Sequence, residues 1–285
     1  MKIRCIALDL DRTTLNSMGH LSEENRIALE KIIHKGVQVI LASGRALTTL
    51  PEEICKIEGI LYAVTSNGAA VYDIRSGECM HRYLMTEESV CRITKFAEER
   101  GLALEVFIEG KAYALADYVK DPVKYGATPK GVPYIQGTRE PVEDIYGFAL
   151  AHKTVLDSMD LIAAGEQEKE AYRAYLEKTV SDIYLTSSVT QLLEISYKDA
   201  GKHTGTDFLL KQLNLKPEEL AAFGDGDNDA ELLSYAGTGI AMANASKMCK
   251  EAADYVTRSN DENGLAYALE NILHLTGQEN ENKGE

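Results

Sequence analysis

The sequence lacks the features that would place it in a membrane, a disulfide-bonded scaffold or an export pathway. No apolar run approaches the roughly 20 residues of a transmembrane helix. The apolar stretch before Asp9 is too short for the core of a signal peptide. The cysteines are odd in number and include no CxxC pair, which argues against a disulfide framework and a structural zinc site; they are Cys5, Cys55, Cys79, Cys91 and Cys249. We therefore expect a cytoplasmic protein.

Positive charge is also scarce. The 285 residues include 30 Lys and Arg against 45 Asp and Glu, a formal charge of −15, and no Lys/Arg cluster. A nucleic-acid-binding chain needs a basic face, and acidity repels anionic membranes, so neither partner is expected. A local cation and a few lysines can still make one cleft suitable for a small phosphorylated metabolite. We expect such a ligand, and a monomer or weak homo-oligomer.

Apolar periodicity in the first third predicts alternating strands and helices. Strands are predicted over 3–10, 37–42 and 59–64, and helices over 22–35 and directly after Ser43-Gly44-Arg45. This β-α-β-α-β order is typical of a parallel sheet wrapped by helices.

The rhythm changes after about residue 83 and returns near 192. The middle stretch predicts a hairpin turning at Glu109-Gly110 and a helix over 166–178. From 192 the pattern predicts a core strand ending near Ser196, a helix over 204–213 and a strand over 220–223. The sequence thus predicts a doubly wound α/β core over 1–82 and 188–285, interrupted by an α+β unit over 83–187. The polar tail from Gly277 is predicted to fray.

Two acids close the first predicted strand. Because side chains alternate along a strand, Asp9 and Asp11 are expected to share one face. Two buried carboxylates repel each other unless a cation or a proton neutralises them. The alternative is a strand that runs into solvent, with Arg12 pairing one acid.

A second acidic cluster follows the predicted strand over 220–223. Asp225, Asp227 and Asp229 stand there with Gly224 and Gly226, which permit a tight turn. An EF-hand does not fit, because alanines stand where its glycine and glutamate belong. A dinucleotide fingerprint fails at Asp229, which replaces a small residue. The alternative that remains is a solvated acidic turn.

Ser43 and Lys202 could bind an anion. Ser43 lies between a predicted strand and helix, where free amides and the helix dipole stabilise negative charge; the alternative is a plain N-cap. Lys202 precedes a helix, but Ser196 and His203 break the P-loop pattern there; the alternative is a solvated charge. All these groups follow strands of a parallel sheet, where ligands bind. Carboxylates from two strands suit a hard cation such as Mg²⁺.

Four stretches of the chain resemble the four motifs of the haloacid dehalogenase (HAD) superfamily: Asp9-Leu10-Asp11-Arg12-Thr13, Ser43, Lys202, and Gly224-Asp225-Gly226-Asp227-Asn228-Asp229. Three more resemble its Cof-type phosphatases: Leu41-Ala42-Ser43-Gly44-Arg45, Ser66-Asn67-Gly68-Ala69 and Ser259-Asn260-Asp261-Glu262-Asn263-Gly264. The resemblance spans nearly the whole chain, and it implies that the unit at 83–187 is an inserted cap domain.

The resemblance also implies a role for each residue. Asp9 would attack phosphorus and form an aspartyl-phosphate, while Asp11 would act as general acid and then general base. Mg²⁺ would be held by Asp9, the Asp11 carbonyl and Asp225, with Asp229 in the outer shell. Substrate and phosphate contacts are expected from Leu10, Ser43, Gly44, Asn67, Lys202 and Asn228, and Arg45 is expected on the core rim facing the cap.

The first motif departs from the family at two places. Arg12 stands where the family usually has glycine, and Thr14 where it has an apolar residue. We expect a Mg²⁺-dependent phosphatase of small phosphate monoesters, sugar phosphates first, with flavin mononucleotide or pyridoxal phosphate as further possibilities. The alternatives are a sugar phosphomutase and a non-catalytic phosphate-binding regulatory protein. Specificity is expected from 111–134, which contains Tyr113, Tyr118, Tyr125 and Tyr134.

Overall fold

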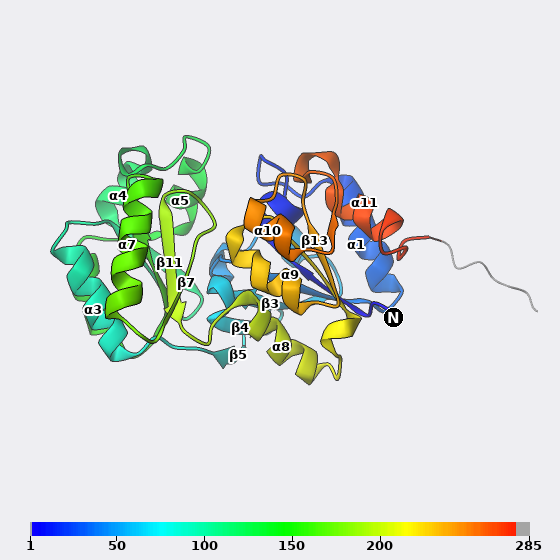
Figure 1. Ribbon diagram of the computed structural model, residues 1–285, viewed down its shortest axis with the longest axis horizontal. Helices are drawn as coiled ribbons and strands as arrows, with labels where there is room; N and C mark the ends of the chain where they lie inside the picture. The colour runs from blue at the N-terminus through cyan, green and yellow to red at the C-terminus, as the bar shows by residue number, and fades with distance from the viewer. Residues whose placement is uncertain (1, 278–285) are drawn as a thin grey trace, which may run out of the picture.

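Two β-sheets, each with its own helices, lie side by side in the protein (Figure 1). The computed structural model describes residues 2–277. The tail predicted to fray from Gly277 lies almost entirely outside the described residues. Each sheet has its own apolar core, so the fold comprises two units.

The first unit is built on an eight-stranded sheet with the order β14-β13-β12-β1-β2-β3-β4-β5. Its first six strands in this order are parallel, and the last two add an antiparallel edge. Buried on both faces, the central strands are nearly continuous apolar runs. The strand bounds are β1 Cys5–Leu8, β2 Gln38–Ala42, β3 Ile60–Thr65, β4 Ala70–Asp73, β5 Cys79–Arg82, β12 Leu220–Gly224, β13 Thr238–Ala241 and β14 Tyr255–Val256.

Two groups of helices cover this sheet. One pairs α1 (Glu23–His34) with α11 (Gly264–Asn271), and the other joins α8 (Lys202–Gln212), α9 (Ala230–Tyr235) and α10 (Lys247–Ala252). The start of α1 was predictable, because the Ser22 side chain accepts a hydrogen bond from the Asn25 amide at 3.2 Å. The predicted α/β core with a parallel sheet is confirmed.

The second unit is a six-stranded sheet with the order β10-β11-β9-β6-β7-β8, antiparallel except for the last pair. The predicted hairpin is present: β6 (Leu104–Ile108) and β7 (Lys111–Leu115) meet at Glu109 and Gly110, whose φ values are 51° and 76°. The remaining elements are β8 Glu140–Val142, β9 Leu156–Ile162, β10 Ile183–Thr186, β11 Leu192–Tyr197, α3 Glu87–Glu98, α4 Ala116–Lys120, α5 Val132–Thr138, α6 Ile145–Ala151 and α7 Glu166–Thr179.

Two predictions about the elements are wrong. The strand over 192–197, assigned to the core, is β11, which pairs antiparallel with β9 in the second sheet. A buried apolar run marks a strand but does not say which strand it pairs with. The boundary that we expect for the inserted unit moves accordingly from 187 to the end of β11. Secondly, the chain after Ser43 forms only a 3-10 turn (Leu47–Thr49) and the short α2 (Glu52–Cys55), because Pro51 interrupts it.

Candidate active site

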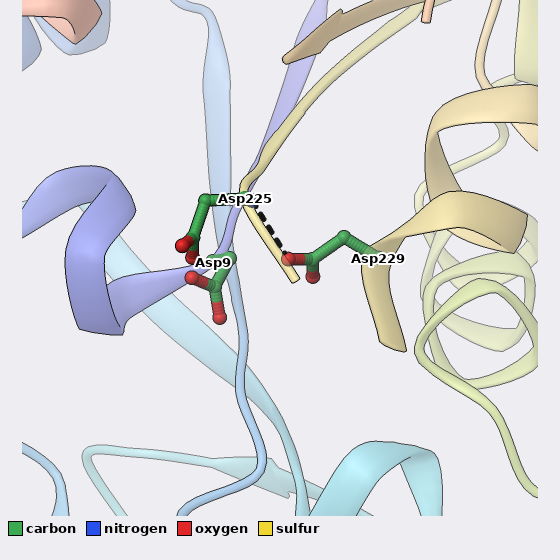
Figure 2. A group of neighbouring side chains, drawn as sticks. All are labelled: Asp9, Asp225 and Asp229. Atoms are coloured by element: carbon green, nitrogen blue, oxygen red, sulfur yellow. Dashed lines mark hydrogen bonds between the residues drawn. The ribbon is translucent and has the colours of Figure 1, made fainter. Parts of the chain in front are cut away.

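Three buried aspartates meet at the carboxyl end of the parallel sheet. Asp9 follows β1 and Asp225 follows β12, and these strands are direct neighbours. Asp229 comes from the 3-10 turn that follows (Figure 2). A carboxylate oxygen of each lies within 4.8 Å of the others. The two acidic motifs of the sequence therefore form one cluster.

Lys202 supplies the positive charge inside this cluster. It is the first residue of α8, is only 2% exposed, and donates to Asp9 Oδ1 at 2.7 Å and Asp229 Oδ1 at 2.6 Å. Burial favours the neutral amine, but Asp229 and Asp9 outweigh burial and raise the pKa of Lys202. Lys202 is thus a charged, fixed ammonium, and the solvated-charge alternative is wrong.

The hydrogen-bonding capacity of Asp229 is taken up within the protein. Its Oδ1 binds Lys202, and its Oδ2 accepts the Asp225 and Gly226 amides, both at 2.9 Å. A Cβ on Gly224 would lie 2.3 Å from the Asp229 side chain, so only glycine allows this packing. Asp229 therefore orients Lys202 and the Asp225 backbone.

Asp9 and Asp225 suit a divalent cation. Burial, and then the charge of Asp229, raise the pKa of Asp9 well above its usual range and that of Asp225 to about 7. Their anionic forms lack sufficient compensating charge, and oxygen ligands are those that hard cations prefer. The acidic cluster could hold a divalent metal.

Asp11 lies apart from the cluster. Because β1 ends at Leu8, strand alternation does not reach Asp11, and the shared-face argument fails. Its half-exposed carboxylate instead accepts from Arg45 Nε at 2.8 Å and from Nη2 at 2.7 Å. Arg45 in turn lies 4.4 Å from the centre of the Tyr134 ring of the second unit. Asp11 still lines the same cavity as Asp9.

The remaining predicted residues surround the aspartates. The Asn67 side chain accepts from Asn228 Nδ2 at 2.9 Å, and Asn67 has a φ of 53°. Ser43 Oγ accepts from the Arg45 amide at 3.2 Å, so it closes a turn and does not cap a helix. The Leu10 side chain is fully buried in the core and can offer a ligand only its backbone.

A cavity of about 470 Å³ lies between the two units. Its floor includes Asp9, Asp11 and Asp225, with Ser43, Gly44 and Asn228 beside them. Of the four tyrosines predicted to set specificity, Tyr118 and Tyr134 line this cavity. Tyr113 packs against Phe148, and Tyr125 packs against Tyr118.

Comparison with known proteins gives a consistent result. Residues 6–269 match the family described as haloacid dehalogenase-like hydrolases. The chain belongs to this family. It is 28% identical to phosphatase YwpJ of Bacillus subtilis over 95% of this chain and 100% of that protein. It is 27% identical to the B. subtilis 5-amino-6-(5-phospho-D-ribitylamino)uracil phosphatase YwtE over 95% and 98%. A solved B. subtilis haloacid dehalogenase-like hydrolase superposes with a TM-score of 0.84 at 29% identity, over 95% and 100%.

The protein is accordingly an enzyme of the HAD-type phosphatase class, a phosphoric monoester hydrolase. Enzymes of this family act on small phosphorylated substrates and generally use a divalent metal, which the acidic cluster could bind. None of the helices within residues 2–277 has the length and apolarity needed to cross a bilayer.

The structure accounts for both departures from the HAD pattern. Arg12 has a φ of 59°, a conformation that glycine adopts without strain, and its Nε lies 3.4 Å from Asp225 Oδ2. The alternative in which Arg12 pairs Asp9 or Asp11 is therefore wrong, because Arg12 pairs an acid of the second cluster. Thr14 is fully buried, and its hydroxyl donates to the Asp9 carbonyl at 2.6 Å, so the polar side chain is satisfied.

Sequence reasoning missed the polar residues that the second unit contributes to the cavity. Asp160, Glu194 and Arg139 line it, and Glu105 accepts from Arg139 at 2.8 Å. A signal was present: Glu105, Asp160 and Glu194 each have an apolar residue on either side in a strand. An isolated acid in a buried strand needs a partner, and this could have identified them.

Proposed function

We propose that this HAD hydrolase is a magnesium-dependent phosphatase that hydrolyses small phosphate monoesters, sugar phosphates in particular, through an aspartyl-phosphate on Asp9. The observation that carries the proposal is the Asp9–Asp225–Asp229 cluster with Lys202, of which Asp9 and Asp225 line the floor of a cavity between the two units. We take the second unit as the cap domain of the HAD fold.

Asp9 is suited to act as the nucleophile. Lys202 binds its Oδ1, which fixes the carboxylate and leaves Oδ2 to form a bond to phosphorus as the bond to the leaving oxygen breaks. The Lys202 ammonium also offsets charge on the transferring phosphoryl group. Asp11, oriented by Arg45 at the cavity wall, gives a proton to the leaving oxygen and later accepts one from the attacking water.

The residues that would hold Mg²⁺ are Asp9, Asp225 and the Asp11 carbonyl. When bound, the ion supplies positive charge that keeps Asp9 ionised and neutralises the phosphate. Asp229 supports the site from outside, since its oxygens already bind Lys202 and two amides. Phosphate contacts are assigned to Ser43, Gly44, Asn228 and the Leu10 backbone, with Asn67 orienting Asn228.

Three further points support the substrate class and the setting. The YwtE relative acts on a phosphate carried by a ribityl chain, and the cavity size suits a similarly small polyol phosphate. All five cysteines are unpaired, which supports a cytoplasmic location. A monomeric or weakly associating state stays a prediction.

The direct test is release of inorganic phosphate from 4-nitrophenyl phosphate and a panel of sugar phosphates, with Mg²⁺ and with chelator. Release should require the metal and fall about a thousandfold or more in Asp9→Asn. Asp227→Asn is the matched control, because Asp227 lies in the same loop as Asp225, is exposed and binds Ser246 instead of the cluster. Acid quench during turnover should trap phosphate on the peptide that contains Asp9.

The same assay separates the alternative functions. Conversion of one sugar phosphate isomer to another without free phosphate would indicate the phosphomutase. Absence of turnover on every ester, with the protein folded and Mg²⁺ present, would indicate a non-catalytic phosphate-binding protein and would refute the proposal.

A further inference from the structure

A row of three carboxylates crosses the second sheet. Glu105 on β6 pairs with Asp160 on β9, and Asp160 pairs with Glu194 on β11. Residues directly opposite in an antiparallel pair point to the same face. The three acids therefore form one row across three neighbouring strands.

This row is on the sheet face that closes the cavity. The alternate residues of these strands, such as Val106, Met159 and Ile195, pack with α3 and α7 residues in the apolar core on the other face. Asp160 and Glu194 line the cavity that has Asp9 at its floor. We call Asp160 and Glu194 the roof acids.

The roof acids differ from the other charged groups of the cavity in having no ion-pair partner among residues 2–277. Asp11 is paired with Arg45, Asp225 with Arg12, and Asp9 with Lys202. The third acid of the row, Glu105, is paired with Arg139 at 2.8 Å. The charge of the second unit is therefore balanced at Glu105 and unbalanced at the two roof acids.

Glu194 also has an oxygen aimed at no partner. The residue is 5% exposed; its Oε1 accepts from Ser188 Oγ at 3.0 Å, while its Oε2 has no hydrogen bond within the described chain. Burial raises the pKa of Glu194 although Asn67 and Ser188 lie close and oppose the rise, and burial and Glu194 raise that of Asp160. Because Glu194 lines the cavity, a ligand bound there could supply the hydrogen-bond donor that this buried acceptor lacks.

A metal ion is not the ligand that this geometry suits. In the described residues, the only group of three or more acidic, His or Cys side chains with ligand atoms all within 4.8 Å of one another is Asp9, Asp225 and Asp229, so the row of Glu105, Asp160 and Glu194 does not form such a group. A ligand that complements the roof acids must instead bring its own hydrogen-bond donors and positive charge, while its phosphate lies at the floor.

We propose that the roof acids bind a protonated amino group on the leaving group of the substrate, so that the enzyme prefers phosphate monoesters of amino sugars or amino alcohols. This inference rests on the proposed function, because it assumes that phosphate binds at Asp9 and Lys202. It follows from the row of acids, the lack of an ion-pair partner for either roof acid among residues 2–277, and the Glu194 oxygen that has no hydrogen bond.

Two matched substrate pairs test the preference. Glucosamine 6-phosphate is compared with glucose 6-phosphate, and 2-aminoethyl phosphate with 2-hydroxyethyl phosphate, each pair differing by an amine in place of a hydroxyl. A hydrogen-bonded charge in a buried site gives a selectivity of about tenfold or more, and kcat/KM should favour the amine by that factor in at least one pair.

Isosteric variants test whether the preference for the amine substrate depends on the roof acids. In Asp160→Asn and Glu194→Gln the ratio of kcat/KM for the amine to that for the hydroxyl substrate should fall towards one, whatever happens to the absolute rates. Glu140→Gln is the control: Glu140 is exposed on β8, outside the cavity, and its loss should leave the ratio unchanged. Thermal unfolding checks that each variant is folded.

The outcomes are distinct. Phosphate release that depends on Asp9 but shows no amine preference in either pair, or a preference that survives in both roof variants, would overturn this inference and leave the proposed function intact. If no ester is hydrolysed, the proposed function fails. Binding of the same four compounds to the wild-type chain, measured by calorimetry, then tests the inference. Equal affinities within each pair would refute it.

Discussion

At the scale of single residues, side chains in the site are held by contacts that reach across the sequence. Lys202 binds an aspartate 193 positions earlier and another 27 positions later. Arg12 contacts Asp225, and Asn67 contacts Asn228. Local backbone strain accompanies them, since Arg12 and Asn67 both have positive φ. Such strain persists where surrounding contacts outweigh its cost.

The backbone conformation at Arg12 predicts which of two substitutions is the more stable, independently of the contacts that the guanidinium makes. Arg12→Gly and Arg12→Ala both remove the guanidinium, but only glycine adopts a φ of 59° freely. We expect Arg12→Gly to be about 1 kcal/mol more stable than Arg12→Ala by urea unfolding. Arg26, inside α1, is the control, because there alanine should be the more stable of the two. Equal stability of the two Arg12 variants would contradict this reading.

Lys202 should be essential for stability in the absence of metal. Its loss leaves Asp9 and Asp229 buried without a cation. We expect Lys202→Met to lower the free energy of unfolding by about 3–5 kcal/mol in chelator. Lys211→Met on the same helix removes an exposed pair with Asp207 and should barely change stability, since water screens such pairs. A small loss at Lys202 would show that the buried pair is not needed for folding.

At the scale of elements, strand ends and helix starts bring the chemistry together. The carboxyl ends of β1 and β12, the turn after β12 and the first residue of α8 supply the acids and the lysine. In the second unit, the register of β6, β9 and β11 places three acids in one row. Pairing partners of strands, and not strand propensity, thus decide which side chains meet.

The start of α3 depends on an ionised side chain. Asp182, next to β10, accepts hydrogen bonds from the hydroxyls of Thr86 and Ser89; burial opposes ionisation, but these bonds prevail and lower the pKa of Asp182. Because the folded-state pKa is below the unfolded value of about 3.9, ionised Asp182 stabilises the fold above that pH. This stabilisation is lost as the pH falls through the folded-state pKa.

We therefore expect Asp182→Asn to lower the urea midpoint at pH 7, with the difference from wild type shrinking as the pH falls below about 4. Denaturation curves at several pH values measure this difference. Asp117→Asn, at an exposed position of α4, should show a small difference that does not vary in this way. A constant difference for Asp182→Asn would argue against the anchoring role.

At the scale of the whole molecule, the cavity exists only where the two units meet. Tyr134 of the second unit lies between Arg45 and Arg139, at 4.4 Å and 4.7 Å from the two guanidinium carbons. The hairpin turn also reaches the core, where the Thr48 amide donates to the Gly110 carbonyl at 2.9 Å. The two units are therefore in contact beside the site.

Metal binding should stabilise the whole fold. A cation at the acidic cluster would offset the repulsion among the buried acids, and the cluster forms only when the chain folds. At one hundred times its Kd, Mg²⁺ should add about 2.7 kcal/mol to the free energy of unfolding. Asp225→Asn should lose most of this gain while remaining as stable as wild type in chelator, and Asp227→Asn should keep the gain. Equal stabilisation of Asp225→Asn would place the ion elsewhere.

Much of the site was predictable from the amino-acid sequence, for a physical reason. Parallel strands with both faces buried are dense apolar runs, and ligands bind at their carboxyl ends, so Asp9 and Asp225 could be placed near one another. The same argument does not hold for Lys202, because the strand before it, β11, pairs in the second sheet. The motifs also predicted the family, which the comparisons confirm. The role of each site residue stays a prediction, and the structure supplies contacts that support it.

The sequence by itself determined the β-α-β rhythm of the core, the hairpin at Glu109-Gly110 and the family, because these depend on local periodicity and short spacings. Only the tertiary structure decided that β11 belongs to the second sheet, that Arg45 holds Asp11, and that Asp160 and Glu194 line the cavity with no ion-pair partner in the described part of the chain. Each of these depends on which distant segments become neighbours, and that is set by the packing of the whole chain and not by any local pattern.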